Sequence, residues 1–300
     1  VSADALRRQT FDPICWIVDD VLPVGACLLA GRPKSKKSWL ALQIAVAVAS
    51  GGIAMSHHDV SAGEVLYLDL ESNARRMHGR LSAMLADDAW PARLQIATAW
   101  PRGDAALAML EQWVFQHPDA RLIVIDILAR IRPPRVPRGD LYEQDYAFVQ
   151  QLNAFAERHN IALLVLHHTS KAHADHVFDT ISGSTGLVGA AATAWVLSAA
   201  ENGEQMLAVQ GRDVTIDDPI ALRWDNYLCQ HVVTATGPAA TTRGRRREVL
   251  NAMAPGADYS ARDLAAALGM SAKNIDNVLR RLIDDGLVTR IGRGRYARIG

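Results

Sequence analysis

No stretch of the chain narrows the choice of fold as strongly as residues 26–50. The apolar run Ala26–Ala30 has the length of a buried strand, and from about residue 39 apolar residues recur at three- and four-residue steps, as in a helix. Between them, Gly31–Ser38 reads GRPKSKKS and follows the frame G-x-x-x-x-[G]-K-[ST]. Backbone N–H groups and the positive end of the following helix surround phosphate in such a loop. The stretch therefore predicts a phosphate-binding loop between a strand and a helix.

This loop departs from its frame at Lys36, where the pattern has glycine because a side chain crowds the tight turn. We expect Lys37 to reach the β- and γ-phosphates of ATP and the Ser38 hydroxyl to hold Mg²⁺. The expected nucleotide-binding residues are Gly31, Arg32, Pro33, Lys34, Ser35, Lys36, Lys37, Ser38 and Trp39. The alternative interpretation is a basic turn that only joins a strand to a helix.

Carboxylates follow two further apolar runs. GEVLYLDLES carries Asp69 and Glu71 at the end of a six-residue strand, and Leu122–Ile125 precede Asp126. Ligands of open α/β sheets bind beyond the carboxyl ends of the strands, so these groups are expected near the phosphate loop. We expect Glu71 to polarise an attacking water and Asp126 to hold Mg²⁺ or its water shell, as a Walker B aspartate does. Glu71 has an alternative role as the cap of the next helix.

Basic and polar residues follow two strands at the same expected edge. Arg132, Arg135 and Arg138 lie among prolines after Asp126, which suits either a polyanion or a solvated loop. The apolar run before HHTSK is expected to end at His168, which can hydrogen-bond the γ-phosphate. The polar, Gly- and Ser-rich segment that follows is expected to be a long loop.

The rest of the pattern up to about residue 213 predicts helices that alternate with strands. Helices are expected at 74–88, 104–116 and 141–159, and further strands at 94–98, 193–200 and 206–213, the last of which completes the sheet. The expected fold class is α/β, with a mainly parallel sheet covered by helices on both faces.

The end of the chain has a different composition. Residues 243–300 hold 12 Lys and Arg against 6 Asp and Glu, whereas residues 1–242 hold 20 against 26. Ser260 and Asp263 cap a helix, and a second helix and two short strands follow. This order predicts a winged helix, whose second helix enters the major groove of DNA. The alternative is a winged helix that docks on a protein.

The predicted domains are a P-loop domain over residues 1–233, a linker over 234–243 and a winged helix over 244–300. The expected DNA-binding residues are Lys171, Arg245, Arg246, Lys273, Asn274, Asn277, Arg280, Arg293 and Arg295. No apolar run reaches about 18 residues and the three cysteines lack metal-binding spacing, so we expect a soluble cytoplasmic protein that does not enter membranes.

Four segments together resemble a known family, the RepA-like hexameric ATPases of the RecA/DnaB-type P-loop superfamily. They are GRPKSKKSWLALQIAVAVASGG, LYLDLES, LIVIDILARI, and LVLHHTSK followed by ISGSTGLVGAA, and the resemblance covers about residues 12–225. It implies a RecA-like P-loop fold, a hexameric ring, and ATP with Mg²⁺ at the loop. It also implies the roles of nucleotide- and Mg²⁺-binding residues for Lys37 and Ser38, catalytic carboxylate for Glu71, Walker B residue for Asp126 and phosphate sensor for His168.

The resemblance leaves the catalytic arginine open. The family places an arginine finger shortly after the motif at Gly183 and Ser184, where alignment puts Ala192 in this chain. DnaB- and KaiC-like relatives carry the finger after a later strand, and Arg212 matches that arrangement. Arg212 of a neighbouring copy is therefore the expected finger.

These features predict an oligomeric DNA-dependent ATPase, a plasmid or mobile-element replicative helicase or helicase loader. Single-stranded DNA would pass through the ring and duplex DNA would bind the winged helix. The alternative is a DNA-binding regulator whose P-loop core is a nucleotide-controlled oligomerisation switch without unwinding. A third interpretation, which Lys36 and Ala192 keep open, is a core that binds nucleotide without hydrolysing it.

Overall fold

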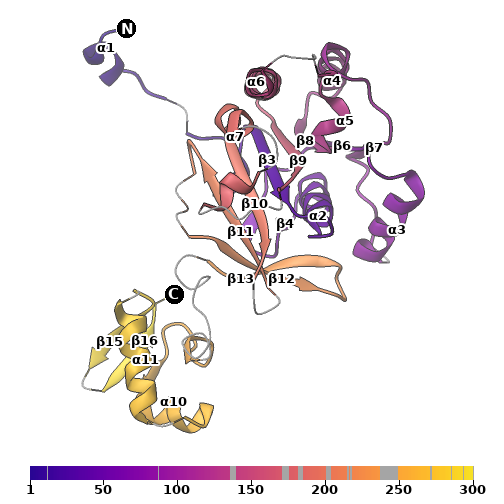
Figure 1. The fold of residues 1–300 in the computed structure, drawn as a ribbon. Helices are drawn as coiled ribbons and strands as arrows, with labels where there is room; N and C mark the ends of the chain where they lie inside the picture. Colours follow the sequence, from indigo (N-terminus) through magenta and orange to yellow (C-terminus); the bar gives the residue numbers. More distant parts are fainter. Residues whose placement is uncertain are drawn as a thin grey trace. The chain divides into compact units, whose positions relative to one another are not determined.

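A computed structural model describes most of the chain (Figure 1). It leaves out residues 12, 87, 136–139, 171–175, 182–184, 201–203, 215, 217, 237–248, 271, 285, 293 and 300, and the side chains of residues 185, 272–274, 277, 281 and 284. The chain divides into two compact units, one made of Val1–Asp217 with Leu222–Val233 and the other of Asp218–Ala221 with Thr234–Gly300. None of the described helices combines the length and the apolar character needed to cross a bilayer.

The first unit is built on a nine-stranded sheet with the order β13-β12-β11-β10-β3-β9-β8-β6-β7. The strands are β3 (Gly25–Gly31), β6 (Glu64–Asp69), β7 (Leu94–Ala97), β8 (Ala120–Asp126), β9 (Ala162–His168), β10 (Thr193–Ala199), β11 (Gln205–Gly211), β12 (Ile220–Asp225) and β13 (Gln230–Ala235). The six strands from β10 to β7 are parallel, and β11 pairs antiparallel to β10. The predicted α/β class with a mainly parallel sheet is confirmed.

Helices cover both faces of this sheet (Figure 1). They are α2 (Lys37–Ser50), α3 (Ala74–Leu85), α4 (Asp104–Gln116), α5 (Leu128–Ile131), α6 (Leu141–His159) and α7 (Thr185–Ala190). One core cluster joins α4, α6 and α7 to alternate residues of the central strands, such as Ala26 and Leu28 of β3. Side chains alternate between the faces of a strand, and α2 packs along β6 and β8 on the other face. Two apolar layers thus bury β3 on both sides, which explains its uninterrupted apolar run.

Short elements precede and interrupt this core. They are α1 (Ala3–Arg7), the ribbons β1 (Trp16–Val18) with β2 (Leu22–Pro23) and β4 (Ile53–Ala54) with β5 (His58–Asp59), and the 3₁₀ turn η1 (Val177–Thr180). The segment expected to be one long polar loop therefore contains η1 and most of α7, although residues 171–175 and 182–184 lie outside the described part.

Two further expectations need correction. The sheet does not end with the strand at Gln205–Gly211, because β12 and β13 extend it by two strands that the sequence analysis did not assign. The helix expected over 74–88 ends at Leu85, since Ala86 takes a non-helical backbone with φ 45°. The expected linker also begins too early, because β13 continues to Ala235.

The second unit has its own apolar core (Figure 1). Its elements are β14 (Asp258–Ser260), α10 (Ala261–Leu268), α11 (Ala272–Asp284), β15 (Val288–Gly292) and β16 (Arg295–Arg298), with the three strands in the order β14-β16-β15. The side chains of Ser260 and Asp263 each accept a hydrogen bond from the other residue's backbone N–H, which confirms the predicted cap. Gly269 ends α10 in the left-handed conformation that glycine adopts without strain. These elements confirm the winged helix.

Candidate nucleotide site

The phosphate loop lies between the buried strand β3 and the first turn of α2, as its sequence predicts. A Cβ atom at Gly31 would lie 2.8 Å from Ser35 Oγ and 3.0 Å from the backbone oxygen of Leu197, so only glycine fits where the loop leaves the strand. Lys37 begins α2, and its side chain is 6% exposed. Burial lowers the pKa of Lys37, while the nearby carboxylates of Asp126 and Glu71 act in the opposite direction.

Lys36 has the backbone conformation that explains why the frame has glycine at this position. Its φ is 64° and its ψ is 18°, in the left-handed region that a residue with a Cβ atom rarely adopts. Its side chain turns to the neighbouring strand β12, where Nζ lies 3.8 Å from the ring centroid of Trp224. The Lys36 ammonium therefore makes a cation–π contact, a role that the sequence analysis did not foresee.

Two carboxylates lie side by side at the ends of β6 and β8. Asp69 pairs in register with Asp126 on the neighbouring parallel strand, and their side chains are 0% and 2% exposed. The Tyr67 hydroxyl lies 3.3 Å from Asp126 Oδ2 and 3.3 Å from the Ser38 carbonyl oxygen. Among the described residues, neither Asp69 oxygen nor Asp126 Oδ1 has a hydrogen-bond partner. Buried carboxylate oxygens without partners are costly unless a cation binds them, so this pair fits Mg²⁺.

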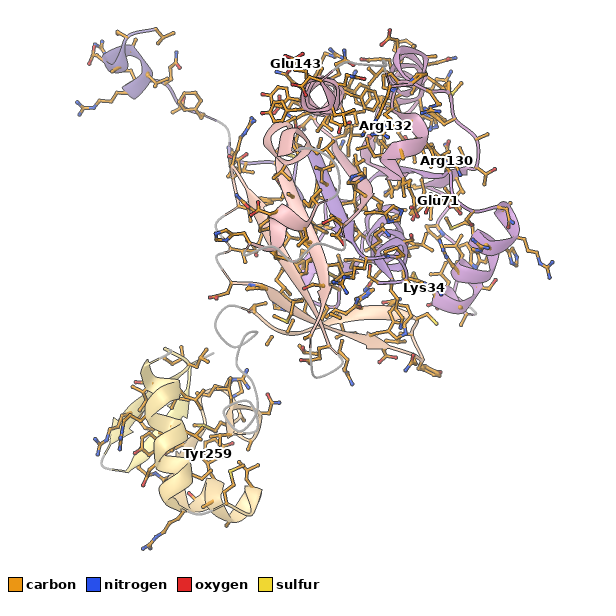
Figure 2. All side chains as sticks on the ribbon, in the orientation of Figure 1. Lys34, Glu71, Arg130, Arg132, Glu143 and Tyr259 are labelled. Carbon is orange, nitrogen blue, oxygen red and sulfur yellow. The ribbon has the colours of Figure 1, made fainter. Side chains whose placement is uncertain are left out.

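His168 joins the loop lysine to Glu71. The Lys37 Nζ atom lies 3.3 Å from His168 Nδ1, and His168 Nε2 lies 3.8 Å from Glu71 Oε1. Because an ammonium group can only donate, Nδ1 is the acceptor and the ring proton of a neutral His168 sits on Nε2, facing Glu71. Glu71 is 42% exposed, so its carboxylate can reach solvent water (Figure 2). The structure thus brings Lys37, His168 and Glu71 into one row.

A cavity of about 520 Å³ opens beside the phosphate loop. Its lining includes Arg32–Ser35, Thr169 and Ser170 after β9, and Val196–Ala199 of β10. Lys34 of this loop is labelled in Figure 2. The volume falls in the range of small-molecule sites, and the lining combines loop residues with hydroxyl groups. A nucleotide therefore has room next to the loop that would hold its phosphates.

The basic loop after β8 is tied to α6. Arg132 and Arg135 lie 3.3 Å and 3.5 Å from the carboxylate of Asp145, which is 6% exposed (Figure 2). These two arginines are therefore engaged inside the unit, whereas the sequence left open a polyanion contact or a solvated loop. Arg138 lies outside the described residues.

Arg212 lies away from the phosphate loop of its own chain. It follows β11, and its N–H donates to the Ala192 oxygen, while the Ala192 N–H donates to the Ala26 oxygen at the start of β3. The phosphate loop begins at the other end of β3, five residues or roughly 16 Å along the strand. Arg212 is exposed, so its side chain is accessible to another molecule.

The expected DNA contacts are only partly described. Lys171, Arg245, Arg246 and Arg293 lie outside the described residues, and Lys273, Asn274 and Asn277 lie on α11 without described side chains. Arg280 is exposed on α11. Arg295 instead pairs with Asp258 at 2.8 Å and lies 3.8 Å from Asp263.

Sequence reasoning missed three residues of the site. Asp69 follows the same apolar run as Glu71, and its alternation with the buried Tyr67 was the signal that it faces the same side as Asp126. Arg80 of α3 acts on the pKa of Asp126 and lies 5.9 Å from the Trp39 ring. Gln205 donates to the Ser35 carbonyl oxygen at 2.7 Å, a contact across 170 residues with no local sequence signal.

Comparison with known proteins agrees with this architecture. One solved structure, described as the ATPase domain of another protein, superposes with a TM-score of 0.54 and 14% identity, covering 69% of this chain and 84% of that one. This likeness supports the RecA-like P-loop fold. No curated protein matches the chain.

Two family models match different parts of the sequence. Residues 243–290 are similar to the bacterial regulatory protein, arsR family, which agrees with the helix-turn-helix of the second unit. The model for the AAA domain family AAA_25 matches residues 1–174, more than half of the sequence. The chain therefore belongs to the AAA domain family AAA_25.

Proposed function

We propose that the chain is an oligomeric DNA-dependent ATPase, a RepA-like replicative helicase or helicase loader of a plasmid or mobile element. The observation that carries this proposal is the row of Lys37, His168 and Glu71 beside the buried pair of Asp69 and Asp126. It places a phosphate-binding cation, a γ-phosphate contact, a water-polarising carboxylate and oxygen ligands at one sheet edge, which are the parts that ATP hydrolysis needs.

In this proposal each side chain has one task. Lys37 and the loop N–H groups bind the phosphates, and Glu71 accepts a hydrogen bond from the water that attacks the γ-phosphorus. The bond from phosphorus to the ADP oxygen breaks as the new bond to water oxygen forms. Ser38 and Asp126, with Asp69, would hold Mg²⁺, which neutralises phosphate charge when bound.

His168 would bind the γ-phosphate through its Nε2–H and lose that contact after hydrolysis. Because Lys37 faces its other nitrogen, His168 can pass a change at the phosphate to the loop, and its Nε2–H lies close enough to Glu71 to respond to both. Arg212 would reach the phosphates of a neighbouring copy, since its exposed position lies far from its own loop. Hydrolysis would then require assembly, in a ring of six copies.

The second candidate is a DNA-binding regulator whose core switches its oligomeric state with nucleotide and does not unwind DNA. The similarity of residues 243–290 to a bacterial regulatory protein favours it. ATP hydrolysis measured with and without single-stranded DNA, at several protein concentrations, separates the two. A specific activity that rises with protein concentration and with single-stranded DNA supports the proposal, whereas turnover that DNA leaves unchanged supports the regulator.

A further inference from the structure

The backbone at Lys36 needs support that a glycine would not need. Its φ of 64° lies in the left-handed region, which glycine enters freely and other residues adopt at a cost. Lys36 is also the residue next to Lys37, so any relaxation of its backbone would turn the lysine that begins α2. The loop therefore requires an interaction that holds Lys36 in this conformation.

The ring of Trp224 supplies a contact of the right kind. Nζ of Lys36 lies 3.8 Å from its centroid, well within the distance at which an ammonium is attracted to an indole face. The same ring packs edge-on against Trp39 at 5.4 Å and His231 at 5.1 Å. Trp224 is therefore held between α2 and β13, and it offers Lys36 a fixed partner.

Hydrogen bonds fix the strands around Trp224. Gln43 of α2 accepts from the His231 N–H at 2.9 Å and donates to the His231 carbonyl oxygen at 2.8 Å. His231 Nε2 lies 2.8 Å from Gln205 Oε1, and Gln205 Nε2 donates to the Ser35 oxygen at 2.7 Å. Strands β11, β12 and β13 thus contact residues 35 and 36 of the loop through one connected network.

We propose that Trp224 is a positioning residue for the nucleotide site, which holds the Lys36 side chain so that the loop keeps its left-handed turn and Lys37 its orientation. The inference rests on the proposed function, because it assumes that nucleotide binds this loop. It explains how the chain uses a lysine where the frame has glycine. The cost of the left-handed turn is offset by the cation–π contact with Trp224.

The test is a double-mutant cycle on the full chain, with ADP and Mg²⁺ as the titrated probe and calorimetry as the readout. Trp224→Leu should weaken binding by roughly 3- to 30-fold, the range expected for loss of a cation–π contact. Lys36→Gly should bind at least as tightly as the unaltered protein, because glycine takes the turn without help. In the Lys36→Gly background, Trp224→Leu should change affinity by less than about 2-fold.

Three further variants sharpen the cycle. Lys36→Arg keeps a cation over the ring and should retain affinity, whereas Lys36→Gln keeps the backbone cost without the charge and should bind as weakly as Trp224→Leu. Trp224→Phe, with a smaller aromatic face, should fall between and guards against misfolding of the leucine variant. Trp90→Leu removes a different, 42% exposed tryptophan and is the matched control.

The outcomes distinguish this inference from the proposed function. Equal weakening by Trp224→Leu in both backgrounds would mean that Trp224 only packs the hairpin, and it would overturn the inference while nucleotide binding stands. Failure of both the unaltered protein and Lys36→Gly to bind ADP would overturn the proposed function itself.

Discussion

Asp69 and Asp126 lie opposite each other in register on the adjacent parallel strands β6 and β8, and both are buried. Burial raises the pKa of the Asp126 carboxyl, with added contributions from the charges of Asp69 and Glu71, while Ser38 and Arg80 oppose the shift. Because the folded-state pKa is raised, the ionised form of Asp126 destabilises the fold at neutral pH, where the unfolded chain carries the charge freely. A bound divalent cation would remove this cost.

Asp126→Asn should therefore raise the melting temperature in the absence of Mg²⁺. A relief of about 1 kcal/mol corresponds to roughly 2–4 °C in a domain of this size. The variant should also gain less stability than the unaltered protein when Mg²⁺ and ADP are added, as thermal unfolding at neutral pH would show. Asp59→Asn, which changes an exposed carboxylate, is the control. An equal gain from Mg²⁺ and ADP in both proteins would contradict a cation site at Asp126.

Glu71→Gln should leave nucleotide affinity close to that of the unaltered protein and lower turnover by a factor on the order of 10² to 10⁴. Glutamine keeps the size of the side chain but cannot polarise water as a carboxylate does. Phosphate release and ADP titration, measured on the same preparation, separate the two effects. Unchanged turnover would leave Glu71 only as a residue beside the helix that starts at Ala74.

Arg212→Ala should bind ATP normally and hydrolyse it slowly, because its side chain would act at the site of a neighbouring copy. Lys37→Ala should lose both binding and turnover. Mixing the two proteins should restore part of the activity, since a mixed interface can combine an intact loop with an intact Arg212. Full activity of Arg212→Ala alone would exclude it as the finger.

The buried imidazole of His231 should make stability depend on pH. Burial, with a smaller contribution from the charge of Lys36, lowers the pKa of His231 to about 4 from an ordinary value of 6.5. Between these values the unfolded chain takes up a proton that the folded chain excludes, so stability falls as the pH drops from 6.5 towards 4. The full loss is on the order of 3 kcal/mol.

Denaturant unfolding at pH 7 and pH 5 tests this expectation. His231→Gln removes the titrating group, so the variant should lose less stability between these two pH values than the unaltered protein, although it starts from a lower value because the contact with Gln205 changes. Parallel pH dependence in the two proteins would contradict the prediction.

The parts of the fold that follow from the sequence are those with local signals. The frame around Lys37 and the apolar runs before Asp126 and His168 each identify a strand end, and parallel strands bring such ends to one edge. Strands β12 and β13 had no such signal, because IALRWD and QHVVTA mix polar and apolar residues without a motif. The contact of Lys36 with Trp224 joins residues 188 positions apart, so only the folded sheet reveals it.

The last prediction concerns the second unit, whose own apolar core and capped helix support independent folding. Residues 243–300 carry twice as many basic as acidic residues, and duplex DNA is the polyanion that a winged helix of this charge fits. We expect the isolated segment to bind duplex DNA with an affinity that falls steeply with salt, with a slope of roughly −0.9 for each phosphate neutralised.

Individual side chains should contribute unequally to this binding. Arg280→Ala removes an exposed cation from α11 and should reduce the salt slope by about 1, weakening all sequences alike. Arg295→Ala should reduce it less, because Arg295 already pairs with Asp258 and Asp263. Asn274→Ala or Asn277→Ala should cost roughly 1–3 kcal/mol on a preferred site and little on random DNA, since an asparagine on the second helix can read a base edge.

A salt titration of the isolated segment on duplex DNA, monitored by fluorescence anisotropy, measures all of these effects. The arginine variants should shift the slope, and the asparagine variants should shift only the difference between preferred and random DNA. Binding that is weak and independent of salt would mean that the winged helix docks on a protein. The DNA contacts of the chain would then have to come from the first unit, where opening the pairs of Arg132 and Arg135 with Asp145 would expose two cations next to the strand that carries Asp126.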